Sequence, residues 1–335
     1  MCVSVGLTYQ SYVKLKRKIR SCMLFEQKND FYLHASACDM ENILCPLAQT
    51  LDKPNFKERY LKLIRGLDDK SIMVVQKALS RLQRAVNGVQ ILADENETKI
   101  LKDLRVNMQN NIIKTGDVFA YMGYFLPVNN FDPSVFYYRL HIDALQTTAK
   151  IKHKDIIDAG AWAGDSALIL SKYTDKKVFA FEPVPQIYNW LLKTVEMNNL
   201  ENVVPINVGV GDKDERRSMY LQGFGSSFVR HIEPGCSTAN DIEVTTIDGF
   251  VEKNNLQVGL IKADIEGFEQ YMLRGAEKTI KSQRPALMIC IYHNESDFFD
   301  IKPLIESWNL DYKFKIVKGV DGNIFSETLL IAEVL

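Results

Sequence analysis

Short apolar runs alternate with amphipathic stretches along the second half of the chain, from about residue 154 onward. Short apolar runs bounded by polar residues predict strands, whereas apolar positions three or four apart predict helices. The predicted strands span 155–159, 177–181, 203–210, 260–263, 286–292, 313–318 and 328–334, and the predicted helices span 166–173, 186–198, 268–282 and 301–308. Such alternation indicates an α/β fold in which helices connect the strands of a parallel sheet.

The last two predicted strands break this alternation, because no helix separates them. Residues 319–323 lie between them and read Gly-Val-Asp-Gly-Asn, and an Asp-Gly pair favours the tight turn of an antiparallel hairpin. The sequence therefore predicts a Rossmann-like sheet of seven strands, in which six follow a parallel order and the last is antiparallel.

The first part of the chain has a different pattern. We expect residues 1–145 to form a mainly α-helical extension that caps the crevice of a second domain at 146–335. Residues 111–150 are rich in aromatic side chains, and Pro127 and Pro133 divide them into expected loops and short helices. This aromatic segment fits two interpretations equally well, the wall of a substrate pocket or the packing seam between the two domains.

Two helices are expected ahead of the aromatic segment, because apolar residues recur there at helical spacing. Asn55 or Asp52 is a suitable cap for the first helix. Ser71 is the expected N-cap of the second helix, and Gly88 its expected stop.

Composition narrows the class of protein. The chain has 335 residues, of which 46% are hydrophobic and 25% charged, as in ordinary globular proteins. Its 41 basic and 42 acidic side chains leave a formal charge of −1, so no overall field favours nucleic acid, and we expect no nucleic-acid partner. One basic run, at 14–20, is interpreted as a solvated helix face; contact with anionic lipid or a phosphorylated substrate is the alternative.

Targeting signals are also absent from the sequence pattern. No stretch has the roughly 20 apolar residues that a membrane helix needs, and basic residues follow the apolar start, where a signal peptide would have them first. The six cysteines include no C-x-x-C pair, which favours reduced thiols over a structural metal site. We expect a cytoplasmic protein with no integral membrane segment and no bound metal; a homo-oligomer stays open.

Two strand ends carry the first candidate site residues. The first strand delivers Asp158, after which Gly160 permits a tight turn and Gly164 opens a helix. The spacing differs from the dinucleotide fingerprint G-x-G-x-x-G, and an acidic residue there suits a ligand amino group better than a pyrophosphate. Glu182 ends the next strand, where a carboxylate can accept hydrogen bonds from both hydroxyls of a ribose.

Two further strand ends complete the set. Asp212 follows the third strand in a small-residue turn, where it suits an adenine amino group or serves as a simple turn residue. Lys262, Asp264 and Glu266 alternate at the end of the fourth strand and therefore point to one side. Charges so arranged need a ligand, a metal or each other, which favours a functional site over a purely structural cluster.

Together these motifs resemble the FkbM family of methyltransferases that use S-adenosylmethionine (SAM). The resemblance covers about residues 150–335 and rests on Asp158-x-Gly160-x-x-x-Gly164, Phe181-Glu182-Pro183, Gly225-Ser226-Ser227, Thr246-Ile247-Asp248 and Lys262-x-Asp264-Ile265-Glu266-Gly267-x-Glu269. It implies a class I methyltransferase fold, SAM as the cofactor, and usually O-methylation of a sugar, polyketide or related hydroxyl. Asp158, Gly160, Gly164, Glu182, Asp212 and Asp264 are then the expected cofactor-binding residues. Trp162 departs from the small or polar residue often found at its position.

Transfer of a methyl group to a hydroxyl needs a positioned acceptor and a general base. The candidate bases are Asp264, Glu266, His293 and His231, of which we expect the first three to line the acceptor side. The acceptor is expected to be a small molecule or a glycan. Two alternatives remain: a Mg²⁺-assisted transfer to a diol, with the same three residues as ligands, and a SAM-fold module that binds without catalysis.

Overall fold

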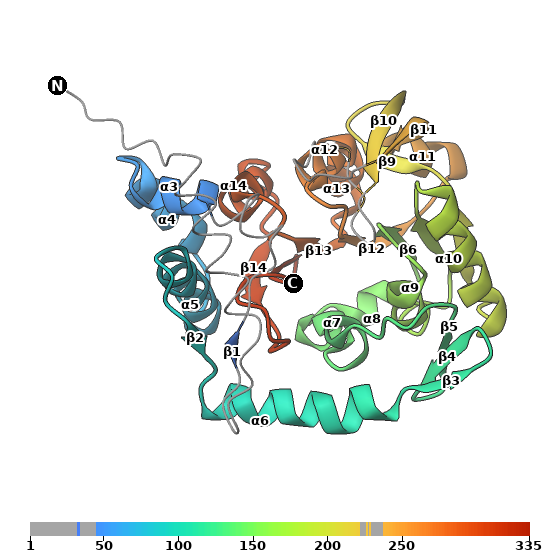
Figure 1. The fold of residues 1–335 in the computed structure, drawn as a ribbon. Coiled ribbons are helices and arrows are strands. Elements are labelled where there is room, and N and C mark those ends of the chain that lie inside the picture. The colour runs from blue at the N-terminus through green and yellow to red at the C-terminus, as the bar shows by residue number, and fades with distance from the viewer. Residues whose placement is uncertain (1–31, 34–44, 222–225, 227, 229–236) are drawn as a thin grey trace.

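A seven-stranded sheet forms the centre of the computed structural model, which describes residues 32–33, 45–221, 226, 228 and 237–335 (Figure 1). Its strands are β6 (Asp155–Ala159), β7 (Val178–Phe181), β8 (Val203–Ile206), β12 (Val258–Ala263), β13 (Ala286–Cys290), β14 (Lys313–Val317) and β15 (Leu329–Glu333). They lie in the order β14-β15-β13-β12-β6-β7-β8. β15 is antiparallel to both of its neighbours and the other pairs are parallel, which confirms the predicted Rossmann-like methyltransferase sheet.

The order of the strands reverses beside β6, since the chain continues to β7 on one side and returns to β12 on the other. In open α/β sheets, ligands bind outside the carboxyl ends of the strands at such a reversal. The register pairs Lys262 with Asp158 and Ala263 with Ala159. The first and fourth sequence motifs therefore meet at this point.

Helices connect these strands. They are α8 (Thr148–Ile151), α9 (Asp165–Leu170), α10 (Pro185–Met197), α11 (Ile247–Asn254), α12 (Glu269–Gly275), α13 (Glu277–Gln283) and α14 (Glu295–Ser307). The helix predicted at 268–282 is thus two helices that meet at Ala276.

The strand predicted at 203–210 is also two elements. The chain leaves the central sheet at Asn207, whose side-chain amide donates to the carbonyl oxygens of Glu182 and Pro183. It then forms β9 (Gly209–Gly211), which joins β10 (Glu215–Leu221) and β11 (Ser237–Thr246) in a separate three-stranded sheet.

Four of the described elements in the N-terminal part are α-helices that precede the aromatic segment. This part contains α3 (Cys45–Leu51), α4 (Phe56–Ile64), α5 (Asp69–Val86) and α6 (Glu95–Asp103), with a short pair of strands, β1 (Tyr32–Leu33) and β2 (Ile91–Leu92). The cap predicted for α5 is wrong: Asp68 caps it by accepting from the Ser71 backbone N–H, 2.8 Å away. The Ser71 hydroxyl instead accepts from the backbone N–H of Ile316 in β14.

The aromatic segment contains strands that the sequence analysis did not predict. β3 (Ile113–Thr115), β4 (Val118–Tyr121) and β5 (Tyr124–Leu126) form a small antiparallel sheet, followed by the short helix α7 (Pro133–Phe136). Gly116 and Gly123 make its two turns at φ values of +60° and +82°, which explains why this segment doubles back instead of forming loops.

α4 and α5 lie at the side of the central sheet that ends in β14, whereas α6 runs away from it (Figure 1). α4 packs against α14, where Arg59 forms ion pairs with Glu295 and Asp300. α5 packs against β14, and one apolar cluster contains both Val75 of α5 and Ile316 of β14. The two parts therefore share a core. Among the described helices, none has the length and apolar character required to cross a bilayer.

Candidate functional site

A cavity of about 320 Å³ opens at the carboxyl ends of the central strands. Its walls come from the residues that follow β6, β7 and β12, from the end of β13 and the segment before β15, and from the chain around α7 and around β9 and β10. Its volume lies within the range of about 300–1,000 Å³ typical of small-molecule sites. The cavity therefore occupies the place where the strand order predicts a ligand.

The glycine turn after β6 brings two motifs into contact. Gly160 lines the cavity at a φ of +76°, and a Cβ at this position would lie 1.9 Å from the backbone oxygen of Asp264. Gly164 does not line the cavity; at a φ of +89° it precedes α9, where a Cβ would lie 2.9 Å from a methyl group of Leu191. One glycine permits contact between strand ends, and the other permits contact between α9 and α10.

Asp158 lies behind the cavity wall and does not line the cavity. It is fully buried, accepts from the Ser166 hydroxyl at 2.7 Å, and lies 3.2 Å from the Lys262 ammonium. Lys262 also donates to the Gly160 carbonyl oxygen at 2.8 Å. Burial lowers the pKa of Lys262, but the charges of Asp158 and Asp264 outweigh it and raise that pKa, so the lysine stays charged and holds the turn in place.

Asp165, which the sequence analysis did not single out, faces the cavity at the start of α9. Its carboxylate accepts from the Ser166 backbone N–H at 2.8 Å, and burial raises its pKa to about 7. The sequence feature that could have identified Asp165 is its position directly after Gly164, at the start of a helix. The carboxylate of this motif that reaches the cavity is therefore Asp165 and not Asp158.

Glu182 lines the cavity at the end of β7 and is 6% exposed. It accepts from the Val184 backbone N–H at 2.8 Å, and burial raises its pKa to about 8. Asp212 is exposed and does not line the cavity, because the chain has already left the central sheet for β9. Of the two carboxylates expected to hold a nucleoside, the structure brings only Glu182 to the site.

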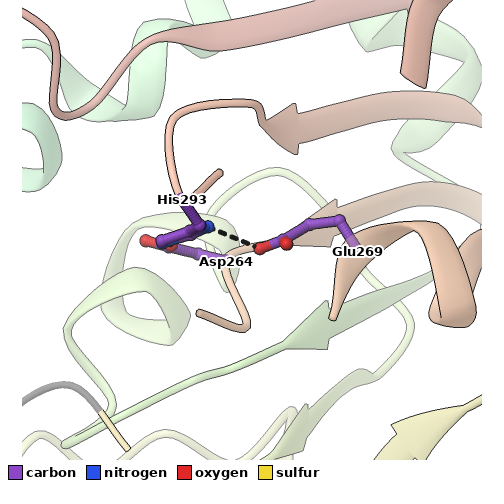
Figure 2. A group of neighbouring side chains, drawn as sticks. All are labelled: Asp264, Glu269 and His293. Carbon is purple, nitrogen blue, oxygen red and sulfur yellow. Dashed lines mark ion pairs between the residues drawn. The ribbon is translucent and has the colours of Figure 1, made fainter. Parts of the chain in front are cut away.

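His293 lies between two carboxylates, as Figure 2 shows. Its Nδ1 is 2.9 Å from Oε1 of Glu269, and its Nε2 is 3.2 Å from Oδ1 of Asp264. The ring is buried behind the cavity wall, whereas the Asp264 side chain reaches the cavity and is 28% exposed. Glu269 enters from the first turn of α12 and is fully buried.

This arrangement fixes the charge of the ring. Burial lowers the pKa of His293, but the charge of Glu269 and the hydrogen bonds to both carboxylates outweigh it and raise that pKa well above its usual value. Burial raises the pKa of Asp264, but the bond to His293 and its charge lower it to about 2. An imidazolium carries a proton on each ring nitrogen and has no free lone pair, so His293 in this state cannot accept a proton.

The three groups also bring possible metal ligands within 4.8 Å of one another. A histidine binds a metal through a neutral ring nitrogen, so the raised pKa of His293 opposes metal binding here. Glu266, the other expected ligand, lines the cavity with its side chain 38% exposed and has a carboxylate oxygen 3.8 Å from Nε2 of His293. The cluster is better described as an ion-paired support for Asp264.

Two further carboxylates at the cavity were missed. Glu327 precedes β15, and the Tyr292 hydroxyl lies 2.9 Å from its Oε1 and 3.2 Å from Oδ1 of Asp264. The last strand was correctly expected to be antiparallel. An antiparallel strand begins at the edge where the parallel strands end, so the sequence could have placed Glu327 at the carboxyl edge of the sheet. Asp132, before α7, reaches the cavity by tertiary packing alone and gave no local signal.

Other sequence motifs have structural roles or lie outside the described residues. Thr246 caps α11 by accepting from the Gly249 N–H, and Asp248 accepts from the backbone N–H groups of Lys278 and Thr279 at the start of α13. His231 and the basic run at 14–20 lie outside the described residues.

The aromatic segment contributes to the cavity wall as well as to packing between the two parts. Arg139, Leu140 and His141 have consecutive positive φ values of 52°, 57° and 55°, and the last two of these residues line the cavity. Burial, followed by the charge of Lys318, lowers the pKa of His141 to about 4. Its ring is therefore neutral at physiological pH.

Comparison with known proteins agrees with this geometry. Residues 158–314 match the protein family described as the methyltransferase FkbM domain. A curated relative, Methyltransferase 1 of Beauveria bassiana, is 26% identical over 174 residues, which is 45% of this chain and 70% of the relative. The solved methyltransferase FkbM from Methylobacillus flagellatus superposes with a TM-score of 0.53 at 19% identity, over 82% of this chain and 58% of that one. The chain thus spans little more than half the length of this solved protein, whose likeness supports the fold.

Proposed function

Residues 158–314 form a methyltransferase FkbM domain, and from this premise we propose that the protein transfers a methyl group from SAM to a hydroxyl of a small molecule or glycan. The observation that carries the proposal is the acidic cavity at the strand-order reversal. Its carboxylates are Asp132, Asp165, Glu182, Asp264, Glu266 and Glu327. Lys262 is the one lysine or arginine among the described residues that line it, and Asp158 already pairs with it.

This charge distribution suits SAM. The cofactor supplies a methyl group on a positively charged sulfur and carries an ammonium group at its amino acid end. A bound cation is favoured where carboxyl groups outnumber the positive charges, because it lowers the pKa of these groups and so favours their ionised form. A phosphorylated cofactor is disfavoured in the same cavity for the opposite reason.

Each part of the cofactor has a proposed partner. We assign the ribose hydroxyls to Glu182, at the tip of β7, and the ammonium group to Asp165. Gly160 allows close approach of the ligand to the backbone of the turn. Asp158 and Gly164 act indirectly in this proposal, through Lys262 and through helix packing, and Asp212 is not part of the proposed site.

The protein contributes position and charge to the reaction. The buried ring of His293 lies next to the Asp264 carboxylate and holds it in place. Asp264 lines the cavity and gives it a negative charge. Holding an acceptor oxygen in line with the methyl group supplies most of the acceleration in such a displacement. The remaining requirement is a carboxylate that takes the hydroxyl proton as the new bond forms.

The test is calorimetric titration of the full chain with SAM and with S-adenosylhomocysteine. We expect the wild type to bind both, and Glu182→Gln to lose about 1.5–3 kcal/mol of binding free energy, the range for hydrogen bonds to a charged group. Glu201→Gln is the matched control, because Glu201 is exposed and remote from the cavity lining. A wild type that binds neither ligand refutes the proposal; equal affinities in the two variants remove Glu182 from the site.

A further inference from the structure

We propose that Glu327 is the general base that takes the proton from the acceptor hydroxyl, an inference that rests on the proposed function. The cofactor side of the cavity comes from the ends of β6 and β7. The other walls come from the ends of β12 and β13, the segment before β15, the chain around α7, and the chain around β9 and β10. Glu327 lies in the segment before β15, beside Tyr292 at the end of β13. Its carboxylate therefore belongs to the acceptor side.

The chain holds Glu327 in this position from both sides. Glu327 has a φ of +63°, a conformation that non-glycine residues rarely adopt without support from their surroundings. The next residue, Thr328, is fully buried; its hydroxyl donates to the Phe325 carbonyl, and its own carbonyl accepts from the Ile291 N–H at 3.0 Å. This anchoring to the end of β13 directs the Glu327 side chain toward Tyr292.

Tyr292 links Glu327 to the fixed part of the site. Its hydroxyl lies 2.9 Å from the Glu327 carboxylate and 3.2 Å from that of Asp264, so one donor serves two acceptors. A hydroxyl has one proton to donate. When it bonds to Asp264, which His293 keeps ionised, the Glu327 carboxylate loses this donor. A carboxylate has about four lone-pair sites, so Glu327 can then accept a proton from elsewhere while the bond from Ser134 remains.

The surroundings of Glu327 make it more basic than an ordinary carboxylate. Burial and the charges of Asp132 and Asp264 raise its pKa to about 8, while hydrogen bonds from Ser134 and Tyr292 oppose this. Cys290, a further titratable group nearby, is buried, and burial raises its pKa well above the usual value, so its thiol is neutral. A base near the operating pH is the most effective.

The other candidates are weaker bases. His293 directs both of its ring nitrogens toward carboxylates. Asp264 has a pKa of about 2 and so holds a proton poorly. The Glu266 side chain is 38% exposed, and one of its carboxylate oxygens lies 3.8 Å from Nε2 of His293. Glu327 combines a fixed conformation, a link through Tyr292 to Asp264, and a raised pKa.

The chemical step balances without a further reactant. The acceptor oxygen forms a bond to the methyl carbon, the bond from that carbon to sulfur breaks with its electron pair going to sulfur, and the hydroxyl proton moves to Glu327. The protonated carboxyl then releases that proton to solvent as the products leave.

The first experiment needs no acceptor. Carboxyl ¹³C resonances of the full chain, labelled in glutamate, are followed from pH 5 to 10 in the wild type and in Glu327→Gln. We expect one resonance that titrates between about pH 7 and 9 and is missing in the variant, and a shift of its midpoint in Tyr292→Phe. If no such resonance disappears in Glu327→Gln, the proposal is overturned.

The second experiment measures single-turnover transfer from methyl-labelled SAM to a panel of methyl glycosides, linear polyols and phenols. We expect Glu327→Gln to slow transfer about 10²- to 10⁴-fold, as loss of a general base does, with SAM affinity within about threefold of the wild type. Glu327→Asp should recover part of the rate. The wild-type rate should rise with pH toward about 8, and this rise should vanish in Glu327→Gln.

Glu333→Gln is the matched control, because Glu333, in the strand that follows Glu327, is a buried carboxylate that does not line the cavity. Transfer by Glu327→Gln at the wild-type rate and with the wild-type pH profile overturns the assignment while leaving SAM-dependent methyl transfer intact. Failure of the wild type to bind SAM is a different result, since it refutes the proposed function itself.

Discussion

Gly160 lies so close to Asp264 that a Cβ on residue 160 would be 1.9 Å from the backbone oxygen of Asp264. The Asp264 backbone N–H in turn donates to the carbonyl oxygen of Ala159 at 3.0 Å. The glycine turn after β6 and the acidic motif after β12 are therefore one structural unit. A side chain at residue 160 would push apart the two strand ends that form the cavity.

The first prediction follows from this contact. Gly160→Ala should lower the free energy of unfolding by about 1–3 kcal/mol more than Gly88→Ala does, the range for overpacking a well-packed site. The two glycines have nearly equal φ values, +76° and +75°, but a Cβ at Gly88 meets nothing within 4 Å. Urea unfolding of both variants separates the steric clash with Asp264 from the backbone strain that both positions share. Equal losses of unfolding free energy in the two variants would show that the strand ends can move apart to accommodate the new methyl group.

The central sheet was predictable because its strands are buried on both faces. Residues 155–159 were predicted as a strand and form β6 with those bounds, and the apolar residues of β12 and β13 gave equally clear runs. The antiparallel β15 followed from the Asp-Gly turn and the missing crossover helix. These features depend on local sequence, so the sequence alone was sufficient.

Features that depend on tertiary packing were not predictable in this way. The protonation state of His293 follows from Glu269, which the sequence placed in a helix but not beside the ring. Asp132 reaches the cavity because the aromatic segment folds back over the sheet edge. Gly116 and Gly123 did mark the hairpin turns of that segment, but its prolines suggested loops and short helices instead.

The second prediction concerns His293. Its folded-state pKa lies well above the unfolded value of about 6.5, so its contribution to stability is complete below pH 6.5 and is lost as the pH rises toward the folded-state pKa. His293→Gln should lose about 3–5 kcal/mol at pH 6, because it leaves buried carboxylates without their counter-charge. Above pH 6.5, the difference from the wild type should shrink by about 1.4 kcal/mol for each pH unit.

Urea unfolding from pH 5 to 9 measures that difference. His153→Gln is the control, because His153 also pairs with a carboxylate, that of Asp175, but its side chain is 70% exposed. An exposed pair contributes about 1 kcal/mol or less. A constant gap between His293→Gln and the wild type over this pH range would show that the ring is not charged in the folded protein.

The third prediction concerns protons released when SAM binds. Burial raises the pKa of Glu182 to about 8, so this carboxyl is mostly protonated at pH 7 in the free protein. Ribose hydroxyls donating to it, and a cation nearby, favour the ionised form. Binding at pH 7 should therefore release up to about one proton from Glu182, and affinity should rise with pH up to about pH 8.

Calorimetric titration with SAM in two buffers of different ionisation enthalpy counts the protons released. Asp165, with a pKa raised to about 7, should contribute a further fraction, so the comparison is made between the wild type and Glu182→Gln. The variant should release fewer protons at pH 7. Identical proton release in the two proteins would mean that Glu182 does not ionise on binding.

The last prediction tests how the N-terminal helices are joined to the methyltransferase domain. β14 is the edge strand of the central sheet, and the backbone N–H of its Ile316 donates to the Ser71 hydroxyl at 2.9 Å. Ser71 is buried in α5, so its hydroxyl provides a hydrogen-bond acceptor for the Ile316 N–H at a place that water does not reach. α5 is therefore hydrogen-bonded to the edge strand of the sheet as well as packed against it.

Ser71→Ala removes the acceptor and leaves the Ile316 N–H unpaired, which should lower the free energy of unfolding by about 1–3 kcal/mol. Ser80→Ala, at an exposed position of the same helix, controls for the change in helix propensity and should stay within about 0.5 kcal/mol of the wild type. Urea unfolding should show one transition in each protein, because the core is continuous from α5 to β14. Two separate transitions would mean that the helices and the methyltransferase domain fold independently. A Ser71→Ala variant as stable as the control would mean that the contact between Ser71 and the sheet edge contributes little to stability.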